Sequence, residues 1–80
     1  MTPPKSNDSG VLDYRSHGYL AYVHCGKRLP LMVLNTNAGW YIGTSDAEGP
    51  CSRESLEYYP SFEDAQTALD NDSWTQKPNP

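Results

Sequence analysis

The central part of the chain alternates between apolar runs and turn-forming segments, a pattern that predicts strands joined by tight turns. Residues 19–25 (YLAYVHC) are rich in aromatic and β-branched side chains and precede a Gly-Lys-Arg turn signal. A second run spans residues 29–36, where Pro30 is compatible only with the start or the edge of a strand. Asn37-Ala38-Gly39 predicts a turn because Asn and Gly adopt positive φ readily, and residues 40–44 form the third run. The three runs predict an antiparallel meander.

The second half of the chain predicts one more strand and then a helix. Residues 45–50 have the composition of a loop, and residues 52–59 alternate between apolar and polar side chains, which favours a fourth, half-exposed strand. Ser61 is placed to cap a helix, with Asp64 three residues later in a capping-box-like position. The helix is expected from residue 62 to about residue 71. Its apolar stripe consists of Phe62, Ala65, Ala68 and Leu69.

These elements predict an α+β fold, with a small three- to four-stranded antiparallel sheet and one C-terminal helix packed on one face. The chain of 80 residues is too short for two independent cores, so residues 11–74 are assigned to a single domain. Residues 1–10 are expected to be a disordered leader and residues 75–80 a flexible tail. Strand alternation and the helix stripe assign the core to Val23, Leu31, Val33, Trp40, Ile42, Leu56, Tyr58, Phe62 and Leu69.

One short helix covers only part of such a sheet, so the opposite face is expected to be solvated, paired with another chain or used for binding. Tyrosine and arginine on that face match the composition of interface centres. We therefore predict a non-catalytic binding module that associates with a protein partner or with itself, as a homodimer, through the sheet face opposite the helix. The expected binding residues are Tyr19, Tyr22, Tyr41, Arg53 and Tyr59. A one-residue slip in strand register would exchange the inner and outer sets.

The charge balance adds an alternative function. The chain has 6 Lys and Arg against 10 Asp and Glu, a formal net charge of −4, which disfavours direct binding to a nucleic-acid backbone. Stacking of bases on tyrosines is a further alternative, but the basic neighbours that such platforms usually have are few. The acidic residues gather in the second half of the chain. This pattern predicts an alternative function, an acidic inhibitor or nucleic-acid mimic that acts on a nucleic-acid-binding protein. The side chains for this function are Glu54, Glu57, Glu63, Asp64, Asp70 and Asp72.

The reactive side chains predict no metal, cofactor or catalytic site. Cys25 and Cys51 are the only cysteines, and reduced thiols are the default expectation. His24 and Cys25 are neighbours on a predicted strand and therefore point to opposite faces, which argues against joint zinc coordination. A small enzyme that uses Cys51 or His24 is the remaining, disfavoured alternative. No apolar run approaches the roughly 20 residues of a membrane span, and no secretory signal is recognisable, so we expect a soluble cytoplasmic protein.

The second half of the chain also resembles a group of small uncharacterised bacterial proteins, some of them carried on mobile elements. The residues that carry the resemblance form the patterns Y-I-G-T, G-P-x-S-R-E-S, E-Y-Y and W-T-Q, at residues 41–44, 49–55, 57–59 and 74–76. The resemblance implies a bacterial cytosolic origin. It implies no activity, cofactor or catalytic residue.

Overall fold

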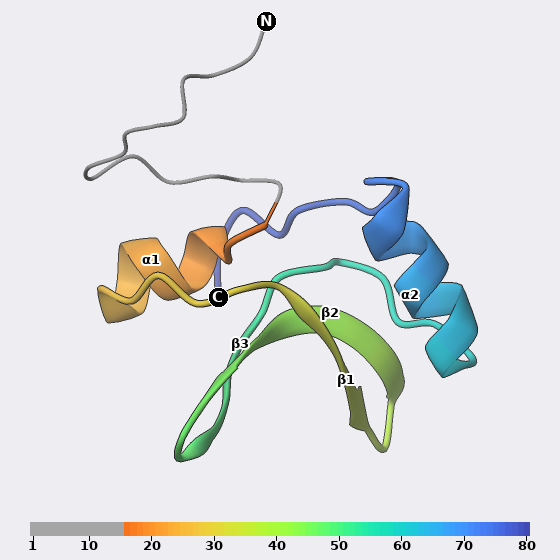
Figure 1. Cartoon of the computed structure of the whole chain (residues 1–80), viewed down its shortest axis with the longest axis horizontal. Helices are drawn as coiled ribbons and strands as arrows, with labels where there is room; N and C mark the ends of the chain where they lie inside the picture. The colour runs from red at the N-terminus through yellow and green to blue at the C-terminus, as the bar shows by residue number, and fades with distance from the viewer. Residues whose placement is uncertain (1–15) are drawn as a thin grey trace, which may run out of the picture.

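The computed structural model describes residues 16–80, which form two helices and a three-stranded antiparallel sheet (Figure 1). In chain order the elements are α1 (Tyr19–Cys25), β1 (Met32–Thr36), β2 (Gly39–Asp46), β3 (Gly49–Arg53) and α2 (Phe62–Asp70). The α+β class and the C-terminal helix are therefore confirmed. The predicted leader, residues 1–10, lies outside the described residues. Within residues 16–80, no helix is long and apolar enough to cross a membrane.

The sheet is a meander of two hairpins in the order β1-β2-β3. The first hairpin turns at residues 37–38, as the sequence predicts, and Gly39 takes up a positive φ of 133°. The second turn is closed by Asp46, whose Oδ1 accepts the N–H of Glu48 at 2.9 Å. The predicted loop at residues 45–50 therefore contains the end of β2 and the start of β3. The meander lies one hairpin further along the chain than predicted.

Residues 19–25 form the helix α1, so the prediction of a strand there is wrong. Gly18 stands at the N-cap and has no side chain to offer. The capping oxygens come instead from Glu54, which accepts the N–H of Leu20 at 2.9 Å and that of Ala21 at 3.1 Å. The glycine after the helix, at φ 69°, ends it. A partner 33 and 34 residues away thus stabilises the helix against the strand propensity of the local sequence.

The fourth strand predicted over residues 52–59 is not formed as a separate element, because regular pairing ends with β3. The N–H groups of Glu54 and Ser55 both donate to the carbonyl of Ile42, at 2.8 and 3.0 Å. Ser55 Oγ accepts the N–H of Ile42 at 3.0 Å, so a side chain replaces one rung of the ladder. Backbone pairing with β2 resumes only at Tyr59, in an isolated bridge.

The C-terminal helix α2 forms where the sequence predicts it, because its signals are local. Ser61 Oγ accepts the N–H of Asp64 at 3.1 Å, as the N-cap assignment requires. Glu63 also lies in the first turn, where a carboxylate favours the helix macrodipole. The helix packs against β1 and β2, and Phe62 meets Trp40 edge-on with ring centroids 5.7 Å apart.

The core is smaller and more polar than predicted. Ile42 is fully buried, as expected, whereas Val23 and Leu56 are 51% and 50% exposed. Tyr58 and Phe62 are also exposed. The two-residue alternation that assigns Val23, Leu56 and Tyr58 to the core is broken by α1 and by the irregular segment after β3. Phe62 is assigned to the core by the stripe of the C-terminal helix instead. The remaining predicted core residues are half-buried: Leu31, Val33, Trp40 and Leu69. The buried apolar residues are Leu20, Ala21, Tyr41, Ile42, Ala65 and Ala68, and the buried polar ones are Thr44, Glu54 and Ser55.

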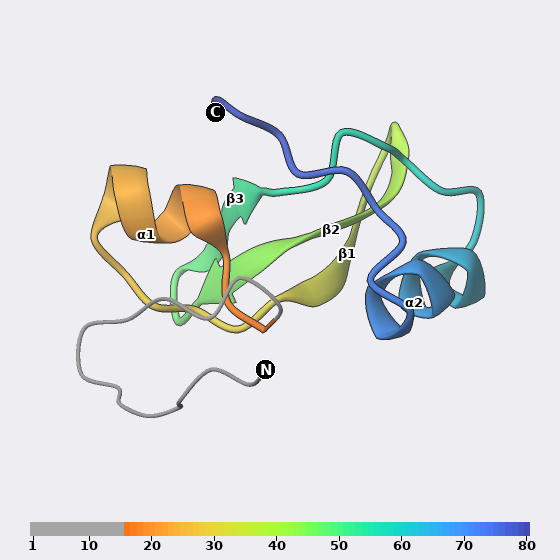
Figure 2. The ribbon, with the colours of Figure 1, turned by 90° about the horizontal axis from the view of Figure 1, so that it is seen from above.

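The two helices lie at opposite ends of the sheet (Figures 1 and 2). α1 packs against β3, and α2 packs against β1 and β2. The C-terminal segment runs back from α2 toward the α1 end of the molecule (Figure 2) and forms an isolated bridge between Ser55 and Gln76. Residues 75–77 of the predicted tail are therefore hydrogen bonded to the rest of the domain. The domain boundaries proposed from the sequence otherwise stay predictions.

Candidate functional site

The strand register identifies the sheet face that points away from α2. Trp40 packs on Phe62 of α2, so its neighbour Tyr41 points to the other face. Leu34 of β1 lies opposite Tyr41. Met32 of β1 and Arg53 of β3 lie on either side of the same residue of β2 and share the face of Tyr41. The ring of Tyr58 contacts that of Tyr41 from the segment after β3. We call this surface the Tyr41 face, and it consists of Met32, Leu34, Tyr41, Arg53 and Tyr58.

Three side chains of the Tyr41 face stack on one another. The Tyr58 ring meets the Tyr41 ring edge-on, with centroids 6.0 Å apart, and the Arg53 guanidinium lies 4.4 Å from the centre of the Tyr58 ring. Tyr41 is only 5% exposed, and this burial raises the pKa of its hydroxyl; Tyr58 raises it further and Arg53 opposes the increase. Tyr58 and Met32 remain 43% and 39% exposed. Tyr58 is therefore the exposed aromatic ring of the stack, and Met32 is exposed on the same face of the sheet.

The binding residues predicted from the sequence do not form one patch. Tyr41 and Arg53 lie on the Tyr41 face. Tyr19 and Tyr22 lie on α1 instead of on a strand. Tyr59 pairs with Trp40 of β2, the residue that packs on α2. The expectation that all of them share a sheet face is wrong, because α1 is helical and the pairing after β3 is irregular. Their role in binding stays a prediction.

Sequence reasoning misses three residues of the Tyr41 face, which are Met32, Leu34 and Tyr58. Strict alternation from Ser52 assigns Tyr58 to the core, but the irregular pairing around Glu54 reverses the parity. The adjacent tyrosines at 58 and 59 do carry a signal, because one of the two faces outward in either register. Met32 carries no local signal, since its exposure depends on the position of β1 at the edge of the described sheet.

Glu54 is a buried carboxyl group, with 0% of its surface exposed. Its Oε1 accepts hydrogen bonds from the N–H of Leu20 at 2.9 Å and from Gln76 Nε2 at 2.7 Å. Its Oε2 accepts from the N–H of Ala21 at 3.1 Å and from Ser52 Oγ at 2.6 Å. Both oxygens are therefore satisfied, and they join α1, β3 and the C-terminal segment. Glu54 is accordingly removed from the acidic surface that a nucleic-acid mimic requires.

Close packing around Glu54 explains the glycine at the start of α1. A Cβ on Gly18 would lie 2.6 Å from Glu54 Oε2 and would collide with Thr44 Cγ2. The hydroxyls of Thr44 and Ser52 share a hydrogen bond of 2.6 Å. Because the N-cap position has no room for a side chain, the acceptors for the first turn come from Glu54.

The C-terminal segment closes another side of this cluster. The N–H of Lys77 donates to the carbonyl of Glu54 at 2.7 Å, and the N–H of Thr75 donates to Glu57 Oε1 at 3.0 Å. Burial raises the pKa of Glu57, but hydrogen bonds from Thr75 and Tyr59 outweigh burial and leave the pKa below its ordinary value. The S-R-E-S and W-T-Q patterns, distant in the chain, therefore meet in space.

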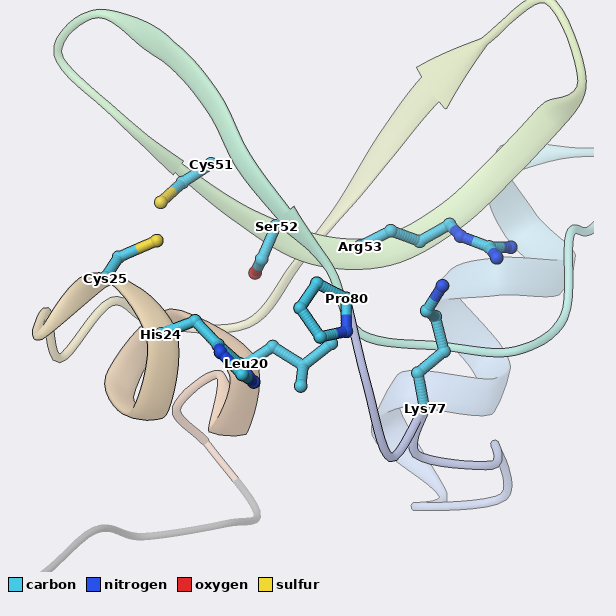
Figure 3. Close-up of a pocket in the computed structure, with 8 residues that line it drawn as sticks. All are labelled: Leu20, His24, Cys25, Cys51, Ser52, Arg53, Lys77 and Pro80. Carbon is cyan, nitrogen blue, oxygen red and sulfur yellow. The ribbon is translucent and has the colours of Figure 1, made fainter.

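A cavity of about 160 Å³ lies between α1, β3 and the C-terminal segment (Figure 3). It brings together His24 and Cys51, the two residues of the enzyme alternative, and adds Cys25. Burial raises the pKa of the Cys51 thiol, and the adjacent Cys25 raises it further. A raised pKa lowers the thiolate fraction, which is the opposite of what a catalytic nucleophile requires.

In the part of the chain that the structure describes, no group of three or more His, Cys, Asp or Glu side chains is placed to hold a metal ion. No family model, curated protein or solved structure matches the chain. The exposure and chemistry of the side chains are therefore the basis on which a function can be proposed.

Proposed function

We propose that this chain is a non-catalytic protein-binding module that associates through the Tyr41 face, with a second copy of itself or with another protein. The observation that supports this function is the exposure of Tyr58 and Met32 beside Arg53 on one face of the sheet. Tyrosine, methionine and arginine are enriched at interfaces, and tyrosine and arginine are frequent among the residues that dominate binding energy.

Two further features favour this face. The stack of Arg53 on Tyr58 holds both side chains in a defined geometry before binding, so less side-chain freedom is lost on association. Among the described residues, β1 is an edge strand, and Met32 and Leu34 lie on it. A partner on the Tyr41 face can therefore also reach the unpaired backbone groups of that edge.

Self-association is the first test. We expect sedimentation velocity of the full chain to show a concentration-dependent dimer, and Tyr58→Ser to weaken it by at least roughly tenfold, because truncation of a central aromatic residue often costs about 2 kcal/mol or more. Val23→Ser is the matched control, since Val23 is similarly exposed but lies on α1. If circular dichroism shows that Tyr58→Ser is unfolded, Met32→Ser tests the same face. A dimer of unchanged strength in a folded variant excludes a homodimer through this face.

A different protein partner is tested by affinity capture from bacterial lysate, with and without nuclease. A protein retained by the wild-type chain and by Val23→Ser, but lost by Tyr58→Ser, supports the proposal. A nucleic-acid-processing protein whose capture depends instead on the charges of Glu63, Asp64 and Asp70 favours the acidic mimic. Capture of nucleic acid itself contradicts both functions and favours base stacking.

A further inference from the structure

The chain's only two cysteines meet in the cavity between α1 and β3. Cys25 is the last residue of α1, Cys51 lies within β3, and these two elements pack on each other. Figure 3 shows the two sulfur atoms pointing toward one another. Burial is the largest cause of the raised pKa of the Cys51 thiol, and the nearby Cys25 raises this pKa further. Each cysteine therefore has one other cysteine in the chain with which it can form an intramolecular disulfide.

Both ends of α1 are anchored, which keeps the two thiols facing one another. At the C-terminal end, Lys27 Nζ lies 2.7 Å from Asp46 Oδ2, so the residue after the helix cap is tied to the end of β2. At the N-terminal end, Glu54 accepts the first free N–H groups of the helix. Cys25 is exposed and Cys51 is half-buried, so a small oxidant can reach the pair from the side of Cys25.

We propose that Cys25 and Cys51 are a redox pair that closes into an intramolecular disulfide by exchange with a low-molecular-weight disulfide such as oxidised glutathione. The Cys25 sulfur attacks one sulfur of the oxidant, the small-molecule S–S bond breaks, and the released thiolate takes up the proton that Cys25 loses. Cys51 then attacks the Cys25 sulfur of the mixed disulfide, and the second thiolate leaves with the Cys51 proton. Two protein thiols are oxidised while one small disulfide is reduced to two thiols.

Closure of this bond ties α1 covalently to β3 and encloses β1 and β2 in the loop between the two cysteines. Such a cross-link restricts the unfolded chain, so oxidation is expected to raise the melting temperature by roughly 10 °C. The inference is independent of the proposed function, because it requires no partner protein.

Incubation of the full chain in glutathione buffers of increasing oxidised fraction tests this pair. We expect the intact mass to fall by two hydrogen atoms with no glutathione retained. A digest should contain one peptide that joins Cys25 to Cys51, and the melting temperature should rise. Excess reduced glutathione should reverse all of these changes.

Cys25→Ser and Cys51→Ser are the matched controls, and each should lose the redox-dependent shift in melting temperature. Three results overturn the proposal: two free thiols in oxidising buffer, stable glutathione adducts on the wild-type chain, or a disulfide that joins two chains only. The mass and peptide measurements use the wild-type protein, so they decide the question even where a serine variant fails to fold.

Discussion

Replacement of Glu54 by glutamine is expected to destabilise the domain far more than the loss of a surface carboxylate. Glu54→Gln preserves side-chain size but converts one of two acceptor oxygens into an NH₂ group, which only donates. Each oxygen of Glu54 accepts one backbone N–H of α1, from Leu20 or from Ala21. In either orientation of the amide, one of these buried N–H groups therefore faces the new NH₂ group and loses its acceptor.

The size of the effect follows from these contacts. A buried donor left without an acceptor costs about 1–3 kcal/mol, and loss of a negative charge at a helix N-terminus costs about 0.3–1 kcal/mol. The expected destabilisation is therefore about 1–4 kcal/mol, a large part of the ~4–12 kcal/mol typical of a domain of this length. For a domain of this size, that corresponds to a melting temperature lower by roughly 5–30 °C.

Thermal and urea unfolding, followed by circular dichroism, measure this loss directly. Glu63→Gln is the matched control, because Glu63 is an exposed glutamate in the first turn of α2, where the change should cost less than about 1 kcal/mol. Amide hydrogen exchange shows which part of the fold is weakened. The N–H groups of Tyr22 and Gly26, which donate the hydrogen bonds at the two ends of α1, should exchange faster in Glu54→Gln. A melting temperature within about 2 °C of wild type, or faster exchange confined to α2, would refute the reasoning.

Two further predictions concern the C-terminal half. Ser61→Ala should destabilise the domain by about 1 kcal/mol in urea unfolding, because it removes the acceptor for the N–H of Asp64, and a change below about 0.3 kcal/mol would contradict the cap. Although burial raises the pKa of Glu57, hydrogen bonds from Thr75 and Tyr59 lower it below its ordinary value in the folded chain. The stabilising contribution of Glu57 is therefore present above the unfolded pKa and is lost as pH falls through the folded pKa. Urea midpoints measured from about pH 5 to pH 3 should therefore fall less steeply for Glu57→Gln than for wild type, and parallel curves would count against this linkage.

The parts of the fold that the sequence predicts correctly depend on neighbouring residues. Ser61 and Asp64 stand one helical turn apart, so α2 can be recognised from its own residues. The first hairpin is recognisable in the same way, because Gly39 follows Asn37 closely and supplies the positive φ. The α+β class follows from these local elements and from strand-like runs that include most of β1 and β2.

The candidate site is less predictable because side-chain parity depends on pairing far along the chain. The sequence is rich in tyrosine and its one predicted helix covers only part of the sheet, which predicts an aromatic surface. It does not predict which tyrosine forms that surface. Ser55 replaces a rung of the β2 ladder, and this irregularity turns Tyr58 onto the Tyr41 face. Tyr41 is therefore covered, and the exposed aromatic residue is the one that alternation assigns to the core.

Composition and nearest neighbours are enough to specify the acidic balance, the turn at residues 37–38 and the capped helix α2 of this protein. Tertiary contacts settle three other features: the helical state of residues 19–25, the burial of Glu54 and the meeting of Cys25 with Cys51. The reason is energetic. Local strand propensity spans only about 1 kcal/mol in a host protein and depends on context, whereas a buried carboxyl group that caps a distant helix contributes hydrogen bonds that are costly to leave unmade. Where such a contact joins residues far apart in the chain, it outweighs the preference of the local segment.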